Sequence, residues 1–266
     1  MGPCYARVMA RKAGHTLYRA PFLKRVSLLP ERVAEPDAFP FSLPVLTWPS
    51  FEIDFTAPVT IFAGPNASGK STLIEALAAL CGFPLHGGNR NFAIGPQGRN
   101  ALAEALRPSW FPKFTSGFFV RAEGFAALIA EIDRLAAEDP GYAADFLAEF
   151  GGRSGTERSH GEGYFHLFSR RIAGRGIYIL DEPEAALSPI RQMEFLKIIH
   201  AAVQRGDAQF LIATHSPLIM AYPGATVLHL TRHGLVERPF RLTDHFAILS
   251  EFHRDPDAFM ATLLLG

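Results

Sequence analysis

Short runs of apolar and β-branched residues alternate along the chain with longer helical patterns. Three such runs, residues 58–63, 177–180 and 209–213, predict strands buried inside a sheet. Residues 51–55 alternate apolar and polar side chains, which predicts a half-buried strand pairing near the strand 58–63. Further strands are expected at residues 22–29, 117–122, 225–230 and 234–237, the last two as an edge hairpin.

Helical periodicity fills most of the spaces between these runs. Residues 72–80 contain good helix formers and no breaker before Gly82. Other helices are expected at 100–106, 125–138, 142–150, 190–203, 243–252 and 256–264. We interpret residues 1–266 as a single domain in which about 96–176 form a mostly helical insertion.

The remaining segments have the composition of loops. Five prolines between Pro30 and Pro49 predict a loop or edge region, and the Gly- and Asn-rich residues 87–98 predict another loop. Residues 1–20 show no period, which indicates a loosely held tail.

Composition excludes several classes of protein. Apolar residues make up 48% of the 266 positions, enough for a core, so global disorder is excluded. Lys and Arg together number 26, as do Asp and Glu, so no overall basic charge favours nucleic acid. A local basic patch is the alternative to ordinary solvated surface for Lys24, Arg25, Arg170 and Arg171.

Cysteine content and hydropathy suggest a compartment. Cys4 and Cys81 are too few for a disulfide framework or a zinc cluster, which favours a reduced, cytoplasmic setting. No apolar run approaches the roughly 18 residues that cross a membrane, so no transmembrane segment is expected. The basic N-terminus has no apolar segment after it and therefore does not resemble a secretory signal.

Residues 64–71 fit the phosphate-binding pattern G-x-x-x-x-G-K-[ST]. A chance match in a loop is the alternative, but the preceding strand and following helix are the context that the pattern requires. Lys70 would reach the β- and γ-phosphates, and the Ser71 hydroxyl would bind Mg²⁺. The expected phosphate-binding residues are Gly64, Pro65, Asn66, Ala67, Ser68, Gly69, Lys70, Ser71 and Thr72.

Two further strands end in residues suited to hydrolysis. Asp181 and Glu182 follow the strand 177–180, where Asp181 suits a Mg²⁺ ligand and Glu182 a general base for the attacking water. His215 follows the strand 209–213 and would hydrogen-bond the γ-phosphate and orient the water. Ordinary surface carboxylates and a structural histidine are the alternatives.

A third segment, residues 159–163, places a serine and glycines at an expected helix start, which can form an anion site. Two phosphate sites on one domain are redundant unless they serve two nucleotides. We therefore expect a head-to-tail dimer in which Ser159, Gly161 and Glu162 close on the ATP of the other copy. Taken alone, this segment is also compatible with a simple loop.

Together these motifs resemble the ATP-binding-cassette (ABC) superfamily of ATPases. Residues 64–71 correspond to Walker A, 177–182 to Walker B, 159–162 to the signature loop and 186–189 to the D-loop, and His215 matches the switch histidine. Within the superfamily the chain is most similar to small stand-alone ATPases related to SMC, RecF and OLD proteins, through residues 22–26, 118–123 and 159–162. Relatives of that subgroup occur near DNA-repair and phage-defence systems.

The resemblance implies an α/β P-loop NTPase fold, with a mostly parallel sheet flanked by helices, an antiparallel edge and a helical subdomain. It also implies ATP and Mg²⁺ as cofactors and an ATP-dependent homodimer. Ala67 and His160 replace glycines of the family pattern. Gln97 or Glu123 would serve as the coupling residue, with Glu123 placed near the metal. Tyr18 is a candidate for adenine stacking.

Three functions remain open at this point. The leading one is an ATPase whose ATP-driven dimerisation acts as a switch on a partner, either DNA or an effector protein. The second is the nucleotide-binding subunit of an ABC transporter, whose channel would be a separate chain. The third is a phosphotransferase in which Lys70 and Asp181 serve a kinase-like reaction, although Glu182 and His215 suit the activation of water better.

Overall fold

The computed structural model describes most of the chain outside its N-terminus and residues 122–173. The described residues are 18–46, 50–84, 88–89, 92–93, 98–114, 116–121, 134, 138, 165, 168–170, 172 and 174–265. The expected tail up to residue 17 lies outside them. So do the expected helices 125–138 and 142–150, apart from Arg134 and Glu138.

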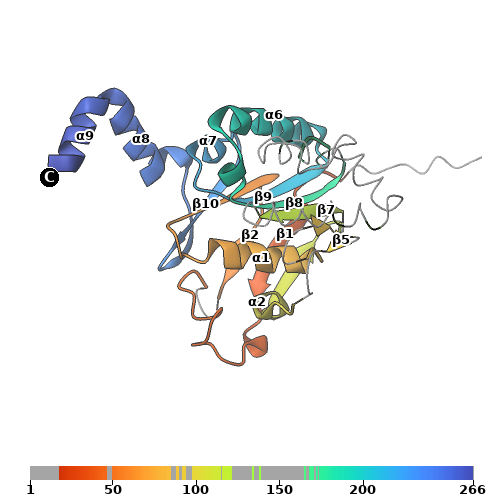
Figure 1. Ribbon diagram of the computed structural model, residues 1–266. Helices are drawn as coiled ribbons and strands as arrows, with labels where there is room; N and C mark the ends of the chain where they lie inside the picture. Colours follow the sequence, from red (N-terminus) through yellow and green to blue (C-terminus); the bar gives the residue numbers. More distant parts are fainter. Residues whose placement is uncertain are drawn as a thin grey trace, which may run out of the picture.

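The described strands form a three-stranded and an eight-stranded sheet (Figure 1). The core strands of the larger sheet are β3 (Val59–Ala63), β7 (Gly117–Arg121), β8 (Gly176–Asp181), β9 (Ala208–Ala213) and β10 (Thr226–Thr231). Its edges are β4 (Gly88–Asn89), β5 (Phe92–Ala93) and β11 (Gly234–Glu237). The order is β11-β10-β3-β9-β8-β7-β4-β5, parallel from β10 to β7 and antiparallel at both edges. This confirms the expected mostly parallel α/β fold with an antiparallel edge.

Helices cover both faces of this sheet. Helix α1 (Lys70–Leu80) lies on one face together with the smaller sheet, and α6 (Pro189–Arg205) and α7 (Pro217–Met220) lie on the other (Figure 1). Alternate residues of β8 point into the two hydrophobic cores, one on each face of the sheet. Ile177 and Ile179 belong to the core under α1, whereas Tyr178 and Leu180 belong to the core under α6. Burial of both faces explains why the sequence of β8 is apolar without alternation.

The smaller sheet corrects one expectation. It has the order β2-β1-β6, formed by β1 (Leu23–Leu28), β2 (Glu52–Asp54) and β6 (Leu106–Trp110). The prediction that residues 51–55 pair near the P-loop strand is wrong, because β2 pairs antiparallel with β1. Ile53 is buried in this sheet, whereas Glu52 and Asp54 form ion pairs with Arg25 on the exposed face. The alternation of apolar and polar side chains in β2 therefore reflects a strand with one buried face.

Two regions contain strands where we expected none. Residues 87–98, expected as a loop, include β4 and β5. Strand β6 includes Pro108, at which we ended the preceding helix. Because β6 is an edge strand, a residue without an N–H group is tolerated there. The preceding helix α2 (Ala101–Ala105) is present as expected, with the Asn100 side chain accepting a hydrogen bond from the Ala103 N–H at 2.8 Å.

The chain ends in two helices that extend away from the sheets (Figure 1). Helices α8 (Asp244–Arg254) and α9 (Pro256–Leu265) match the expected helices 243–252 and 256–264. No residue of either helix is buried. Three short 3-10 helices lie elsewhere in the described chain: η1 (Pro30–Arg32), η3 (Pro183–Ala186) and η4 (Phe240–Leu242). Within the described residues, no helix combines the length and apolarity needed to span a bilayer.

Gln209 of β9 joins the two sheets. Its side chain is fully buried, accepts hydrogen bonds from the N–H groups of Phe22 and Leu23 at 2.8 and 2.9 Å, and donates one to the Leu23 carbonyl at 3.0 Å. These bonds satisfy three backbone groups at the start of β1. The polar side chain of Gln209, inside a central strand of the larger sheet, therefore connects that sheet to the smaller one.

Replacing this connector should destabilise the fold. We expect Gln209→Leu to lower the free energy of unfolding by about 3 kcal/mol, because buried backbone groups lose their partners. Urea denaturation measures the change, and Gln204→Leu at an exposed position of α6 is the matched control. Equal stability of the two variants would show that Gln209 does not hold the sheets together.

Candidate functional site

The loop between β3 and α1 is shaped by two glycines. Gly69 precedes α1 with φ 93°, a conformation that favours glycine. A side chain on Gly64 would lie 2.9 Å from the Leu230 carbonyl oxygen, closer than a Cβ can approach. Ala67 also has a positive φ, of 60°, at a position where the family pattern has glycine. The loop therefore delivers the N-terminus of α1, with its free N–H groups, to the site.

The Lys70 ammonium lies inside this loop. It is 4% exposed and donates to the carbonyl oxygens of Gly64 at 3.0 Å and Pro65 at 2.9 Å. Burial lowers the pKa of Lys70, while the charges of Glu182, Asp181 and Glu184 act to raise it. Within the described part of the chain, the buried hydroxyl of Ser68 has no hydrogen-bond partner. The loop thus offers a cation and a hydroxyl to an anion.

Asp181 lies at the end of β8, against the start of α1. The Ser71 hydroxyl donates to Asp181 Oδ1 at 3.3 Å, and Arg121 Nε at the end of β7 lies 3.5 Å from Asp181 Oδ2. Arg121 also pairs with Glu75 of α1. Burial raises the pKa of Asp181 to about 6, although Arg121 and Ser71 act to lower it.

Glu182 and His215 face each other across the ends of β8 and β9. His215 Nε2 lies 3.8 Å from Glu182 Oε1, and their side chains are 31% and 39% exposed. Burial and then the charge of Lys70 lower the pKa of His215. Glu182 adopts the left-handed conformation with φ 51° and ψ 52°, which is unfavourable for a residue with a Cβ. The strand ends therefore combine a carboxylate and an imidazole beside the P-loop.

Glu184, in η3, was missing from the predicted site. Its Oε1 accepts hydrogen bonds from the backbone N–H groups of His215 and Ser216. The Ser216 hydroxyl donates to Gln192 Oε1 at 2.6 Å, and Gln192 in turn donates to the Leu187 carbonyl at 3.0 Å. This network fixes the backbone of His215 to the segment after β8. The acidic sequence 181–184 was the available signal, but its third carboxylate could not be paired with a loop 31 positions away.

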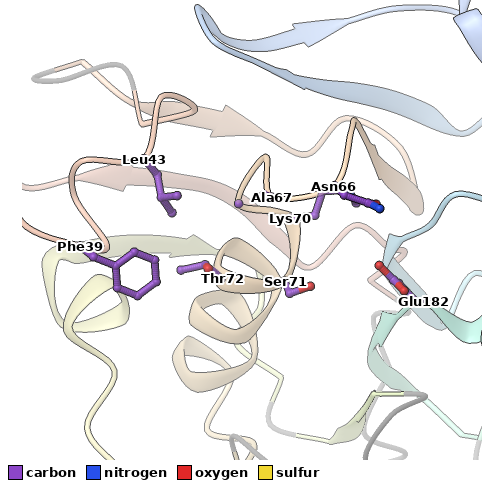
Figure 2. A pocket seen from close by; sticks show the side chains of 9 residues that line it. Phe39, Leu43, Asn66, Ala67, Lys70, Ser71, Thr72 and Glu182 are labelled. Atoms are coloured by element: carbon purple, nitrogen blue, oxygen red, sulfur yellow. The ribbon is translucent and has the colours of Figure 1, made fainter.

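A pocket of about 500 Å³ lies beside the P-loop, with Phe39 and Leu43 on one side and Glu182 on the other (Figure 2). Its walls are formed by Phe39, Leu43, Asn66, Ala67, Gly69, Lys70, Ser71, Thr72 and Glu182. Phe39 is 71% exposed and comes from the Pro-rich segment, which the sequence showed only as a loop. Tyr18, our sequence candidate for adenine stacking, instead packs against Phe111 with ring centroids 5.2 Å apart.

The structure places Lys70, Ser71, Asp181, Glu182 and His215 close to one another, and their assigned roles remain predictions. Of the other predicted residues, Gly64–Gly69 and Thr72 form the loop and the start of α1, whereas Gln97, Glu123, Ser159, Gly161 and Glu162 lie outside the described residues.

The side chains present fit a nucleotide polyphosphate and a magnesium ion. Mg²⁺ usually binds through one or two carboxylates together with hydroxyl, water and phosphate oxygens. Ser71 Oγ and Asp181 Oδ1, 3.3 Å apart, are such a pair of oxygens. The pocket next to Lys70 is large enough for a nucleotide, and Phe39 gives it an aromatic wall.

The buried carboxylate of Asp181 should cost stability when no metal ion binds it. Its raised pKa means that it stabilises the fold below about pH 4, and this contribution is lost as the pH rises through about 6. We expect Asp181→Asn to raise the free energy of unfolding of nucleotide-free, EDTA-treated protein at pH 7.5 by up to about 3 kcal/mol.

Urea denaturation at pH 7.5 and pH 4.5 tests this expectation, and the gain should shrink at the lower pH. Glu182→Gln, at a neighbouring carboxylate that is 39% exposed, is the control and should show no such gain. A destabilised Asp181→Asn variant at pH 7.5 would contradict the assigned cost of burial.

Family models match two parts of the chain. One, described as "AAA domain", matches residues 47–106, which include the P-loop. The other, described as "AAA domain, putative AbiEii toxin, Type IV TA system", matches residues 163–221, which include Asp181, Glu182 and His215.

Several curated proteins are also similar to the chain. The cytochrome c biogenesis ATP-binding export protein CcmA of Rhizobium meliloti is 30% identical over 185 residues, 64% of this chain and 83% of CcmA. The hemin import ATP-binding protein HmuV of Streptomyces coelicolor is 30% identical over 221 residues, 74% of each chain. The thiamine import ATP-binding protein ThiQ of Cereibacter sphaeroides is 30% identical over 164 residues, 58% of this chain and 69% of ThiQ.

Among solved structures, the chain matches cbiO1 from Clostridium perfringens, part of the ABC transporter complex cbiONQ. It has a TM-score of 0.45 and 16% identity, and the match covers 81% of this chain and 91% of that one. The SMC head domain from Thermotoga maritima has a TM-score of 0.40 and 16% identity, with coverage of 82% and 98%.

Proposed function

The chain belongs to the ABC-type ATPases, and from this premise we propose that ATP joins two copies head to tail and that hydrolysis releases them. The dimer would act as a switch on a partner, DNA or an effector protein, in a process such as DNA repair or phage defence. The observation that carries the proposal is the meeting of Lys70, Glu182 and His215 at one edge of the sheet.

Binding of the triphosphate is assigned to the P-loop. The N–H groups at the start of α1 and the Lys70 ammonium would hold the phosphates, and the Ser68 hydroxyl is free to donate to them. Ser71 and Asp181 would hold Mg²⁺, which supplies charge neutralisation on the phosphate oxygens when bound. Arg121 and Ser71 would keep the Asp181 carboxylate oriented toward the start of α1.

Activation of water is assigned to Glu182. Its carboxylate would accept a proton from the water that attacks the γ-phosphate, and the His215 imidazole would hold that water and the phosphate in line. Glu184 supports this step indirectly, because it fixes the backbone of His215 through an N–H hydrogen bond. The left-handed backbone of Glu182 is a local cost of the kind that gathers at catalytic sites.

The openness of the site supports the dimer. Glu182 and His215 keep 39% and 31% of their side chains exposed, so in a single copy both side chains remain partly accessible to bulk water. Exclusion of water strengthens the electrostatic interactions that stabilise phosphoryl transfer. We propose that Ser159, Gly161 and Glu162 of the second copy provide this cover and contact the triphosphate.

Slowing hydrolysis should trap the dimer. We expect Glu182→Gln to lower the turnover number by about 10²- to 10⁴-fold, because the general base is lost while ATP binding remains. At saturating ATP this variant should elute at the mass of a dimer in gel filtration with light scattering. The double variant Lys70→Ala/Glu182→Gln is the matched control and should remain monomeric. A monomeric Glu182→Gln protein at saturating ATP would contradict the proposal.

The adenine ring is expected to stack on Phe39. Stacking of a base on an aromatic side chain contributes about 1–3 kcal/mol, so Phe39→Ala should raise the KM for ATP about tenfold at an almost unchanged turnover number. Phe111→Ala is the control, because Phe111 is 61% exposed but lies outside the pocket. Steady-state kinetics of both variants measure this change in KM. An unchanged KM in Phe39→Ala would show that Phe39 does not bind the adenine ring.

A second candidate function is the nucleotide-binding subunit of an ABC transporter. It is supported by the names of HmuV and ThiQ, which are import ATP-binding proteins. A membrane protein that co-purifies with the chain in detergent would favour the transporter. Stimulation of ATP hydrolysis by DNA would favour the switch. Of the basic residues considered for nucleic acid, Arg25 is engaged with Asp54 at 2.6 Å and Glu52 at 3.3 Å.

A further inference from the structure

His215 contacts a second histidine from the C-terminal part of the chain. The ring centroids of His215 and His245 lie 6.2 Å apart, with an angle of 49° between the ring planes. His245 belongs to the first turn of α8, the helix that extends away from the sheets (Figure 1). The first turn of this projecting helix therefore lies next to His215, the proposed catalytic histidine.

The first turn of α8 is firmly anchored. The hydroxyl of Thr243, which is 1% exposed, accepts a hydrogen bond from the Phe246 N–H at 3.2 Å and donates one to the Phe240 carbonyl at 2.8 Å. The rings of Phe240 and Phe246 pack at 5.3 Å, and the Arg241 guanidinium lies 5.7 Å from the centre of the Phe246 ring. These contacts fix the position of His245, although α8 has no buried residue.

The imidazole of His215 lacks a comparable hydrogen bond. Glu184 holds its backbone N–H, but the buried Nε2 atom has no hydrogen-bond partner among the described residues. Glu182 Oε1 lies 3.8 Å from that atom, beyond hydrogen-bond range. The buried Nδ1 of His245 likewise lacks a partner within the described chain. The contact between the rings is therefore one of packing, and it limits how far the imidazole of His215 can rotate.

We propose that His245 is a positioning residue for ATP hydrolysis, whose ring keeps the imidazole of His215 turned toward Glu182. This inference rests on the proposed role of His215. It makes α8 a coupling element, because a displacement of its first turn would release His215 while leaving Lys70 and the P-loop in place. The exposed helices α8 and α9 would then control turnover without changing the affinity for ATP.

Kinetics of His245→Ala test this inference. We expect the turnover number to fall about tenfold with an unchanged KM for ATP, since a small misplacement of a catalytic group is enough for such a loss. His253→Ala, at an exposed position of the same helix, is the matched control and should keep the wild-type turnover number. An unchanged turnover number in His245→Ala, an equal loss in His253→Ala, or a raised KM alone would each overturn the inference.

Two further variants separate positioning from general damage to the fold. His245→Phe keeps a ring of similar shape and should restore the turnover number to within about threefold of wild type, whereas His245→Asn keeps a polar group without the ring and should not. If His245→Ala fails to fold, as judged by circular dichroism, this pair decides the question. Equal activity of the Phe and Asn variants would contradict a role for ring packing.

A double-mutant cycle distinguishes failure of this inference from failure of the proposed function. His215→Ala should lower the turnover number, and adding His245→Ala to it should cause no further loss, because the two residues act through one imidazole. If His215→Ala hydrolyses ATP at the wild-type rate, the proposed role of His215 is wrong, and the inference fails with it. If His215→Ala is slow but the two losses multiply, only the inference about His245 is overturned.

Discussion

The parallel pairing of β3, β9 and β8 is the constraint on which the site depends. Because adjacent parallel strands end at the same edge of a sheet, the residues that follow them meet there. Lys70 comes from the helix after β3, His215 follows β9 and Asp181 ends β8. The buried apolar runs of these strands fix the register. The chemistry of the P-loop therefore rests on the packing of two hydrophobic layers around one sheet.

The site is built at a local cost in stability. Asp181 is a buried carboxylate with a pKa raised to about 6, and Ala67 and Glu182 hold left-handed backbone conformations. Each is unfavourable for folding, and each lies where the triphosphate and its water are expected to bind. Ligands that favour the charged, ordered form of these groups would recover part of that cost. This accounts for the concentration of unfavourable features at one edge of an otherwise regular sheet.

Sequence patterns predicted the parts of the site that follow strands. Asp181 and His215 were identifiable because each closely follows an apolar run, and Lys70 was identifiable because the loop around it has a defined spacing. Phe39 and His245 were not identifiable, since each reaches the site from a segment whose position depends on tertiary packing. The predicted partner of β2 was wrong for the same reason. Alternation shows that one face of a strand is buried, but it does not show which strand lies beside it.

Mixing two inactive variants shows whether two copies share each ATP. Lys70→Ala loses its own P-loop but keeps the segment around Ser159, and Ser159→Ala has the opposite defect. A mixed dimer contains one intact composite site, so we expect the equimolar mixture to hydrolyse ATP well above the sum of the separate variants. A mixture as inactive as either variant alone would contradict a shared site and place all the catalytic groups within one copy.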